Sequence, residues 1–371
     1  MKKLIFMAFL PLLIACSGKQ EKGVNGKDTL SFHYAQNICI LQHEGYTEVQ
    51  LANPWKKGEV LHTYLLVPRD QKLPAPLPSG SVVRTPLQKA VVYTSVHSGL
   101  ICELGAASSI AGVCERQYMH SPTILEGLRT GRIADLGDST NPNVEGIIDM
   151  GTDALFASPF ENSGGYGRVE QTGIPIIECA DYMELSPLAR AEWMRFYGML
   201  FGREAEADSL FRTIEGRYLT LREQAKKATE EPLLLTDKLY GSTWYVPCRN
   251  SHAGQLYLDA HCRFVGMNHE GTGSTALSFE SIFEQAAEAD IWLMRYNQSN
   301  PLTYVQLAQD YRPYASFQAF QKRHIWGCNT GDTDFFDHTT FHPDALLREL
   351  IIILHPEILP GEETKYFKPM K

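Results

Sequence analysis

The chain has 371 residues, of which 44% are hydrophobic, and it carries a formal net charge of -9. A chain of this length can bury a large core, and its size favours two domains over one. The acidic balance argues against a surface of clustered lysine and arginine that could neutralise phosphates. We therefore expect no nucleic-acid partner.

The N-terminus has the pattern of a lipoprotein signal. Two lysines precede an apolar run over residues 4–14, which is too short to span a bilayer. The run ends in Leu-Ile-Ala-Cys, which resembles a bacterial lipobox and implies that Cys16 carries lipid. We expect a signal peptide over 1–15 and a polar tether over 16–28. An ordinary secretory signal with an incidental cysteine is the alternative.

The next segment is expected to form a β extension over residues 29–85. Between residues 30 and 67, aromatic and β-branched residues alternate with polar ones, which indicates antiparallel strands. A proline-rich stretch over 68–78 then separates these strands from the rest of the chain. This extension is therefore interpreted as an addition to the main fold.

A strand-helix-strand unit follows the extension. Residues 90–93 form a short apolar run fit for a buried strand, a helix follows, and residues 110–113 predict a second strand. In such units ligands gather at the carboxyl ends of the strands. The polar residues after the first strand are candidates for ligand contact, with helix capping as the alternative role: Ser95, His97 and Ser98.

The same alternation continues to about residue 185. After an irregular stretch to residue 138, Asn141-Pro142-Asn143 is expected to start a short helix, and residues 154–157 predict a strand. A loop with two aromatic residues and a strand over 174–177 complete the pattern. Strands that alternate with helices indicate a parallel sheet, here in a first lobe over 86–185.

A helical region opens at Ser186-Pro187. Four apolar residues spaced for one helix face, Leu210, Ile214, Tyr218 and Leu221, fall within it. We expect one bridging helix over residues 186–230, which would reach ~60 Å at 1.5 Å rise per residue. Such a helix could join two lobes.

The second half of the chain, residues 231–371, repeats the alternation. Strands are predicted over 233–236, 291–294 and 325–326, and helices over 254–260, 278–287, 305–310 and 343–354. Residues 144–149 and 279–284 also resemble each other, since each set leads through an acidic residue to a strand. The predicted fold class is therefore α/β, with two lobes around central parallel sheets.

The motifs of common catalytic centres are missing from the sequence. No Gly-x-Ser-x-Gly surrounds Ser95, and two-residue spacing does not by itself assemble a nucleophile with His97 as base. No glycine-rich phosphate loop follows the opening strand. We expect no catalysis, although a hydrolase that uses Ser95 and His97 with a third acid remains an alternative.

Metal and disulfide frameworks are also not indicated. The spacing of Cys248, His252, His261 and Cys262 does not match a closed zinc site. His338 and His342 are interpreted as ordinary surface histidines. Apart from Cys16 the chain has seven cysteines, an odd number, and a single Cys248–Cys262 bridge stays open as an alternative.

Aromatic and polar residues follow the strands in both halves. Such a set suits a cleft between two lobes, because aromatic walls bury a bulky ligand and an arginine can pair with its acidic groups. Packing in the core is the alternative for each aromatic residue. The candidate ligand contacts are Phe160, Tyr166, Tyr240, Trp244, Tyr245, Arg295, Tyr296 and Phe335.

Taken together, these segments resemble one family of binding proteins. The lipobox, YTSVHSGLICELG, NVEGIIDMGTDALFASPF, the bridging region and FHPDALLRELIIILHPEILP are similar to the iron-complex and vitamin B12 periplasmic-binding proteins of ABC importers. The resemblance covers residues 87–358. It implies a shallow cleft between two α/β lobes, and one glutamate on each lobe that docks on the permease. By motif these are Glu145 and Glu280, whose alternative role is to stabilise a helix N-terminus.

The expected protein is a monomeric lipoprotein on the periplasmic side of the cell envelope. It would capture a ferric siderophore, haem or a corrinoid, without a cofactor of its own, and deliver it to the membrane subunits of an ABC permease. The sequence does not choose among these ligands. A sensor or adhesion lipoprotein on the same fold is the alternative function.

Overall fold

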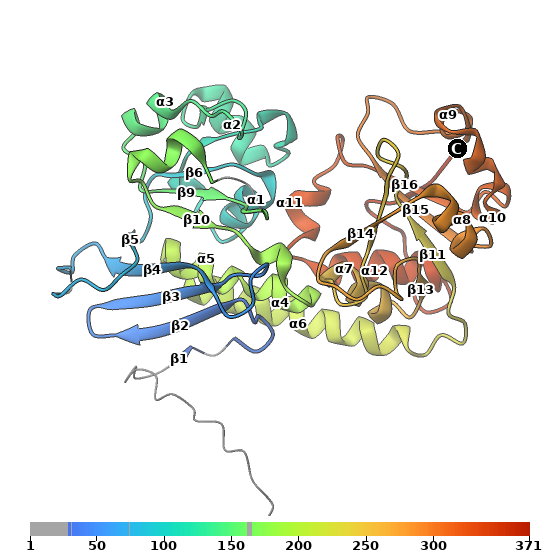
Figure 1. Cartoon of the computed structure of the whole chain (residues 1–371), viewed down its shortest axis with the longest axis horizontal. Coiled ribbons are helices and arrows are strands. Elements are labelled where there is room, and N and C mark those ends of the chain that lie inside the picture. The colour runs from blue at the N-terminus through green and yellow to red at the C-terminus, as the bar shows by residue number, and fades with distance from the viewer. Residues whose placement is uncertain (1–28, 31, 74, 162–164) are drawn as a thin grey trace, which may run out of the picture.

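The computed structural model describes residues 29–30, 32–73, 75–161 and 165–371. The expected signal peptide, the tether and Cys16 lie outside these residues. Figure 1 shows two lobes side by side, with α6 along their base and the N-terminal sheet below the first lobe. Among the described helices, none is both long and apolar enough to cross a membrane.

The N-terminal extension is a five-stranded sheet. Its first four strands pair antiparallel with their neighbours, as the alternating pattern predicts, and the fifth pairs parallel with the fourth. Tyr64 attaches this sheet to the first lobe, because its hydroxyl donates to Ile176 O and accepts from Glu178 N, each at 2.8 Å. The strands are β1 (Thr29–Leu30), β2 (Ile38–His43), β3 (Tyr46–Ala52), β4 (Val60–Pro68) and β5 (Ser81–Thr85).

Two buried carboxylates fix the segment between β1 and β2. Glu192 accepts hydrogen bonds from three backbone N–H groups, those of residues 33–35, at 2.7–2.9 Å. Glu184 accepts from the N–H groups of residues 36 and 37 at 3.0 and 2.9 Å. Both glutamates are fully buried, so these bonds supply the partners that buried charges and buried N–H groups require.

The first lobe is built on a parallel sheet in the order β10-β9-β6-β7-β8. Its strands are β6 (Ala90–Val92), β7 (Ile110–Val113), β8 (Ala134–Asp135), β9 (Ala154–Ala157) and β10 (Ile176–Glu178). Its helices are α1 (Ser95–Glu103), α2 (Pro122–Thr130) and α3 (Val144–Asp149), and its 3-10 turns are η1 (Ala107–Ser109), η2 (Arg116–Tyr118), η3 (Gly167–Thr172) and η4 (Asp181–Met183).

Helix α2 lies in the stretch expected to be irregular. It begins with a proline at its first position and ends at Gly131, whose φ of +75° suits a left-handed helix end. Its buried side includes Ile124, which joins the core of the first lobe. The helix is short, and it has few buried residues to mark one face in the sequence.

The region expected as one bridging helix consists of three. These are α4 (Pro187–Glu192), α5 (Met194–Phe201) and α6 (Glu204–Ala225). Trp193 interrupts the first two and is fully buried in the first-lobe core, while Gly202 ends α5 with a φ of +63°. Only α6, with 22 residues, spans from lobe to lobe, and its length is about 33 Å.

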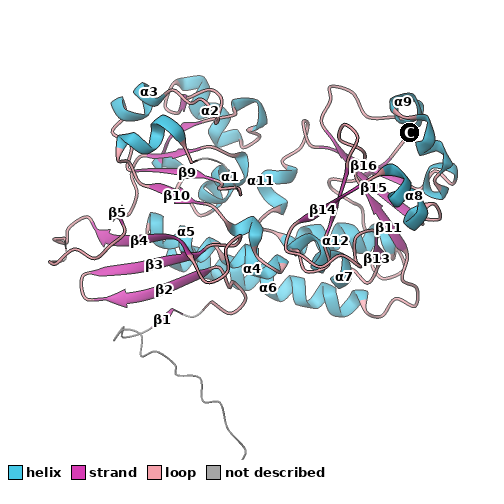
Figure 2. Ribbon diagram, viewed as in Figure 1, coloured by secondary structure: helices cyan, strands magenta, loops and turns pink. Residues whose placement is uncertain are grey.

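The second lobe has a sheet in the order β13-β11-β15-β16-β17, in which only β17 is antiparallel, and a two-stranded sheet of β12 and β14 (Figure 2). Its strands are β11 (Leu233–Thr236), β12 (Trp244–Pro247), β13 (Arg263–Phe264), β14 (Ser274–Leu277), β15 (Ile291–Tyr296), β16 (Ile325–Asn329) and β17 (Lys368–Pro369). Its helices are α7 (His252–Asp259), α8 (Phe279–Ala286), α9 (Tyr304–Asp310), α10 (Gln318–Gln321), α11 (Phe335–Thr339) and α12 (Pro343–Leu354), with the 3-10 turn η5 (Arg312–Ser316).

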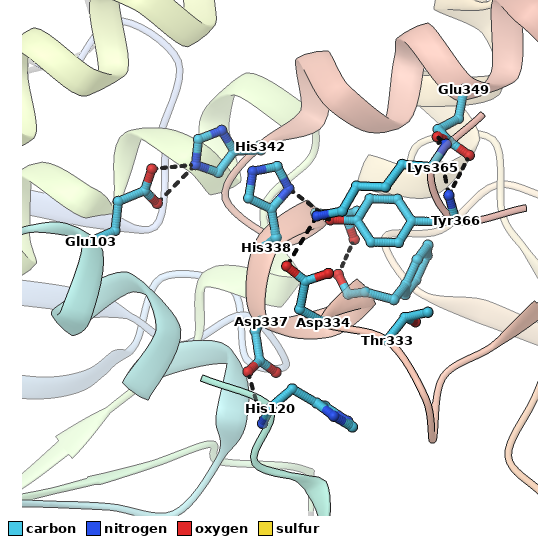
Figure 3. Close-up of polar contacts among 12 residues, drawn as sticks. Glu103, His120, Thr333, Asp334, Asp337, His338, His342, Glu349, Lys365 and Tyr366 are labelled. Carbon is cyan, nitrogen blue, oxygen red and sulfur yellow. Dashed lines mark hydrogen bonds and ion pairs between the residues drawn. The ribbon is translucent and has the colours of Figure 1, made fainter. Parts of the chain in front are cut away.

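The C-terminal part of the chain, from residue 341 onward, contacts both lobes. Phe341, between α11 and α12, is buried in the core of the first lobe. Glu349 in α12 is buried and accepts hydrogen bonds from the backbone N–H groups of residues 365–367, which hold the C-terminal segment beside β16 (Figure 3). The two-lobe α/β fold class predicted from the sequence is confirmed.

Candidate functional site

A cavity of about 300 Å³ lies between the lobes and is called here the inter-lobe cavity. It lies where β6 and β7 end in the first lobe and where β15 and β16 end in the second. Such carboxyl ends are the usual ligand sites of parallel sheets. Its lining residues are Tyr93, Thr94, Ser95, Val96, Glu115, Tyr118 and His120 from the first lobe, and Asn297, Thr330, Phe336 and Asp337 from the second.

Two polar atoms in this cavity have no hydrogen-bond partner among the described residues. They are the hydroxyl of Tyr93 and Oδ1 of Asp337, and both atoms are buried. The other carboxylate oxygen of Asp337 accepts from the backbone N–H of His120 at 3.4 Å (Figure 3). Burial raises the pKa of Asp337, although the Ser95 hydroxyl and His120 oppose that rise.

Asp337 reaches the first lobe because α11 packs closely on α1. Gly99 is the point of contact, since a Cβ atom at this position would lie 2.6 Å from the carbonyl oxygen of Asp337. Any larger residue would push the two helices apart. The glycine in YTSVHSGLICELG therefore positions one wall of the inter-lobe cavity.

A second cavity, of about 320 Å³, is called here the arginine cavity. It lies mainly in the second lobe and is closed by Pro187 and Arg190 of α4. Phe336 contributes to both cavities, so the two are neighbours across α11. Its other principal lining residues are Thr236, Asp237, Tyr245, His252, Tyr257, Arg295, Phe335, Thr339, Leu350 and Phe367.

Each arginine of this cavity has a carboxylate partner within the protein. Arg295 Nε donates to Asp237 Oδ1 at 3.0 Å, a second bond joins the same two side chains, and the carboxylate raises the pKa of Arg295. Arg190 Nε donates to Asp181 Oδ2 at 2.9 Å. Its Nη1 lies 3.2 Å from His252 Nε2, where burial and the charge of Arg190 lower the pKa of His252 to about 3. A neutral His252 can accept this hydrogen bond.

His97 extends the same network into the first lobe. Its Nε2 lies 3.2 Å from Asp181 Oδ1, and its Nδ1 lies 2.7 Å from Thr94 Oγ1. Burial alone would lower the pKa of His97, but the Cys179 sulfur and the Asp181 carboxylate together raise it to about 10. A protonated His97 donates from both nitrogens, which suits these two partners.

The Ser95–His97 pair expected for a hydrolase is not assembled. A third acid is present, since Asp181 contacts His97, but the second ring nitrogen faces Thr94 instead of Ser95. A histidine that stays protonated near neutral pH also cannot accept a proton from a serine. The Ser95 hydroxyl instead lies near Asp337 in the inter-lobe cavity.

The other candidate contacts fall into three groups. Tyr245, Arg295 and Phe335 line the arginine cavity, as a ligand role requires. Ser98 and Trp244 are fully buried: the Ser98 hydroxyl donates to Ser95 O at 3.1 Å, and Trp244 packs on Trp292. These two are therefore core residues, because helix α1 and the second-lobe core enclose them.

The third group lies outside both cavities. Tyr240 and Phe160 are largely exposed, at 83% and 63%. The Tyr166 hydroxyl donates to the Glu178 carboxylate at the end of β10. Tyr296 packs over Gly327, where its ring would meet a Cβ atom at 2.9 Å. The sequence placed these residues correctly near strand ends, but their side chains do not converge on one site.

The two expected docking glutamates occupy equivalent places. Glu145 and Glu280 are exposed in the first turns of α3 and α8, one on each lobe. A side-chain cap precedes each: Asn143 accepts from Gly146 N at 3.0 Å, and Ser278 accepts from Ser281 N at 3.2 Å. Both positions suit an acid that interacts with the positive end of a helix.

His338 and His342 differ from the surface histidines expected from the sequence. Their rings stack at 4.1 Å, and His342 is buried with Nε2 at 2.8 and 2.9 Å from the two oxygens of Glu103 (Figure 3). Glu103 ends α1, so this contact joins the lobes. His342 faces inward because the segment before α12 packs on the first lobe.

The remaining candidates are four histidines and cysteines, Cys248, His252, His261 and Cys262. Within the described ranges, no three His, Cys, Asp or Glu side chains are arranged to hold a metal ion. The seven cysteines after Cys16 are all free thiols, so Cys248 and Cys262 are not bridged. Both are buried, and they behave as small apolar side chains in the second lobe.

The residues of these sites that were missed from the sequence include four central polar ones: Tyr93, Asp337, Arg190 and Asp237. Two of them had a usable signal. Tyr93 ends the predicted strand 90–93, and Asp237 directly follows the strand 233–236. Arg190 and Asp337 lie in helices, and only the packing of the lobes brings them to the cavities.

Comparison with known proteins agrees with this geometry. A family model described as periplasmic binding protein matches residues 91–330. A lipoprotein of Methanocaldococcus jannaschii, named as uncharacterized, is 24% identical, over 99% of this chain and 96% of its own.

Two solved structures share the fold at 15% identity. One belongs to an ABC-type Fe3+-hydroxamate transport system from Saccharomonospora viridis; the similarity has a TM-score of 0.58 and covers 73% of this chain and 94% of that chain. The other is a periplasmic heme binding protein from Pseudomonas aeruginosa, with a TM-score of 0.58 and coverage of 76% and 98%. At this identity, the likeness is one of fold.

Proposed function

The chain belongs to the periplasmic binding protein family, and from this premise we propose that it captures an iron complex or a corrinoid and delivers it to an ABC permease. The inter-lobe cavity carries the proposal, because residues from both lobes line it. A ligand bound there contacts both lobes at once and favours their closed arrangement.

Related folds support this class of ligand. The structures compared above include a protein named for haem binding and one named for Fe3+-hydroxamate transport. Aromatic residues of the arginine cavity, Tyr245, Phe335 and Phe336, would supply apolar contact to such a complex. Their neighbour Arg295 would supply a charge-assisted hydrogen bond.

Ligand capture can be tested by quenching of intrinsic tryptophan fluorescence. The purified protein would be titrated with haemin, cyanocobalamin and several ferric siderophores, all of which absorb light and quench by energy transfer. We expect saturable quenching with one class of ligand. Arg295→Ala should weaken that binding about tenfold, which corresponds to loss of one charge-assisted contact. Absence of saturation with every ligand would refute capture.

Delivery to a permease would depend on Glu145 and Glu280. Charge reversal of both, Glu145→Lys with Glu280→Lys, should abolish ligand uptake by cells and leave ligand affinity unchanged. A matched control reverses Asp149 and Glu284, which are exposed acids on the same two helices. Uptake that is equal in the test and control variants would count against docking through the first-turn acids.

Attachment to the membrane would depend on Cys16. We expect Cys16→Ser to release the protein from the membrane fraction into the soluble fraction of the envelope. Family membership supports an envelope location, and the lipoprotein relative supports a lipid anchor. A variant that stays with the membrane would contradict anchoring through this residue.

A further inference from the structure

Two residues that line the inter-lobe cavity carry a buried polar atom, one a hydrogen-bond donor and one an acceptor, that bonds to none of the described residues. The donor is the hydroxyl of Tyr93, a residue that is 5% exposed, and the acceptor is Oδ1 of Asp337. They come from different lobes. Buried polar groups without partners cost free energy, which a ligand that bonds to both would recover.

The charges of the cavity favour a particular ligand. Its ionisable lining residues include the acids Glu115 and Asp337 and the histidine His120, and the lining set contains neither lysine nor arginine. Glu115 already accepts hydrogen bonds from Ser139 and Gln117, so its oxygens are engaged. Asp337 is the acid with a free oxygen in this set. An incoming carboxylate would meet these two acids, with His120 as the one basic side chain of the lining set.

Building on the proposed function, we infer that the inter-lobe cavity binds a primary ammonium group of the ligand, with Asp337 as its acceptor and Tyr93 as donor to a neighbouring ligand oxygen. At about 300 Å³ the cavity lies at the lower limit of small-molecule sites. It therefore takes one arm of a metal complex. Asp337 and Tyr93 are specificity-determining residues that discriminate cationic from anionic complexes.

A matched pair of iron complexes tests this specificity. Ferrioxamine B is a trihydroxamate complex with a free ammonium tail, and N-acetylation removes that charge. We expect ferrioxamine B to bind at least tenfold more tightly than its acetylated form, and Asp337→Asn to abolish this preference. Tyr93→Phe should weaken both complexes. Asp149→Asn, the control, removes an exposed acid of α3 outside both cavities and should change the preference less than twofold. Equal binding of the two complexes, or a preference that persists in Asp337→Asn, overturns the inference.

A second measurement decides the inference even if no iron complex binds. The protein would be labelled with 3-fluorotyrosine, and the Tyr93 resonance would be assigned as the one lost in Tyr93→Phe. Propylammonium should shift this 19F resonance saturably in the wild type and not in Asp337→Asn, whereas propionate at equal ionic strength should not shift it. A shift with ammonium but no binding of complexes refutes the proposed function alone. No shift, or an equal shift with propionate, refutes the ammonium site.

Discussion

The two cavities use their polar side chains in opposite ways. In the arginine cavity, Arg190 and Arg295 are each bonded to a carboxylate of the same protein. In the inter-lobe cavity, Tyr93 and Asp337 each have a buried polar atom without a hydrogen-bond partner in the part of the chain that the structure describes. A paired arginine fixes the shape of a wall and offers a ligand only its remaining N–H donors, while an unpaired group has no competing partner. Arg295, which stands out in the sequence, is therefore a weaker indicator of ligand specificity than Tyr93, which does not.

The largest effect should come from breaking the paired network at Asp181. This carboxylate is 1% exposed and contacts both Arg190 and His97. Asp181→Ala would leave the buried His97 and the partly buried Arg190 without their anion, so we expect the free energy of unfolding to fall by about 3–5 kcal/mol. Chemical denaturation would measure it.

The control for this prediction is an exposed ion pair. Asp310 Oδ2 lies 2.5 Å from Lys238 Nζ at the surface. Asp310→Ala should therefore lower the free energy of unfolding by less than about 1 kcal/mol. Similar losses in the two variants would show that the Asp181 network is not what stabilises the arginine cavity.

The pH dependence of stability should identify His97 as a cation of this network. Its pKa of about 10 lies above the ordinary value near 6.5, so its protonated form stabilises the folded state. This contribution is complete below about pH 6.5 and is lost as the pH rises towards 10, by at most about 1.4 kcal/mol per pH unit. Denaturation at pH 6 to 10 would measure the slope. His97→Gln should flatten it, and an unchanged slope in that variant would assign the effect elsewhere.

Moving one wall of the inter-lobe cavity should have a smaller effect. Gly99→Ala places a methyl group 2.6 Å from the Asp337 carbonyl oxygen, so we expect a loss of about 1–3 kcal/mol in stability and weaker ligand binding. Gly216→Ala is the matched control, because open space surrounds this glycine in α6. It should be neutral or stabilise the helix by up to about 1 kcal/mol. Thermal unfolding would compare the stabilities of the two variants. A stabilised Gly99→Ala variant would contradict the close contact of α1 with α11.

The smallest effect is expected outside both cavities. Tyr240 is 83% exposed, and Tyr240→Ser should change stability by less than about 0.5 kcal/mol and leave ligand affinity unchanged. Tyr245→Ala, in the wall of the arginine cavity, should weaken ligand binding severalfold. If calorimetric titration shows the reverse order, the ligand lies nearer to Tyr240 than either cavity allows.

Much of the fold was predictable because buried parallel strands and long amphipathic helices leave local patterns. The strands over 110–113, 154–157 and 233–236 and the helix over 343–354 have the bounds that the sequence predicts. The β12–β14 pair was not predicted, because its partners are far apart in the chain and no tight turn joins them.

The site was less predictable than the fold for a physical reason. Aromatic residues near strand ends were recognised, yet Trp244 is buried in the core and Tyr240 points to solvent, since a strand end does not fix the direction of the residues that follow it. Whether a hydroxyl such as that of Tyr93 has a partner depends on the whole tertiary structure. Asp337 reaches the same cavity only through the packing of α11 on α1.

The bonds of Glu192 have a mechanical consequence. A tension applied to the chain before β1 first loads the short β1–β2 pairing and then the three backbone N–H groups that Glu192 holds. Glu192 belongs to α4, which also contributes Arg190 to the arginine cavity. A pull on the N-terminal side therefore loads the junction of the two lobes through α4, in parallel with the attachment of Tyr64 to the first-lobe sheet.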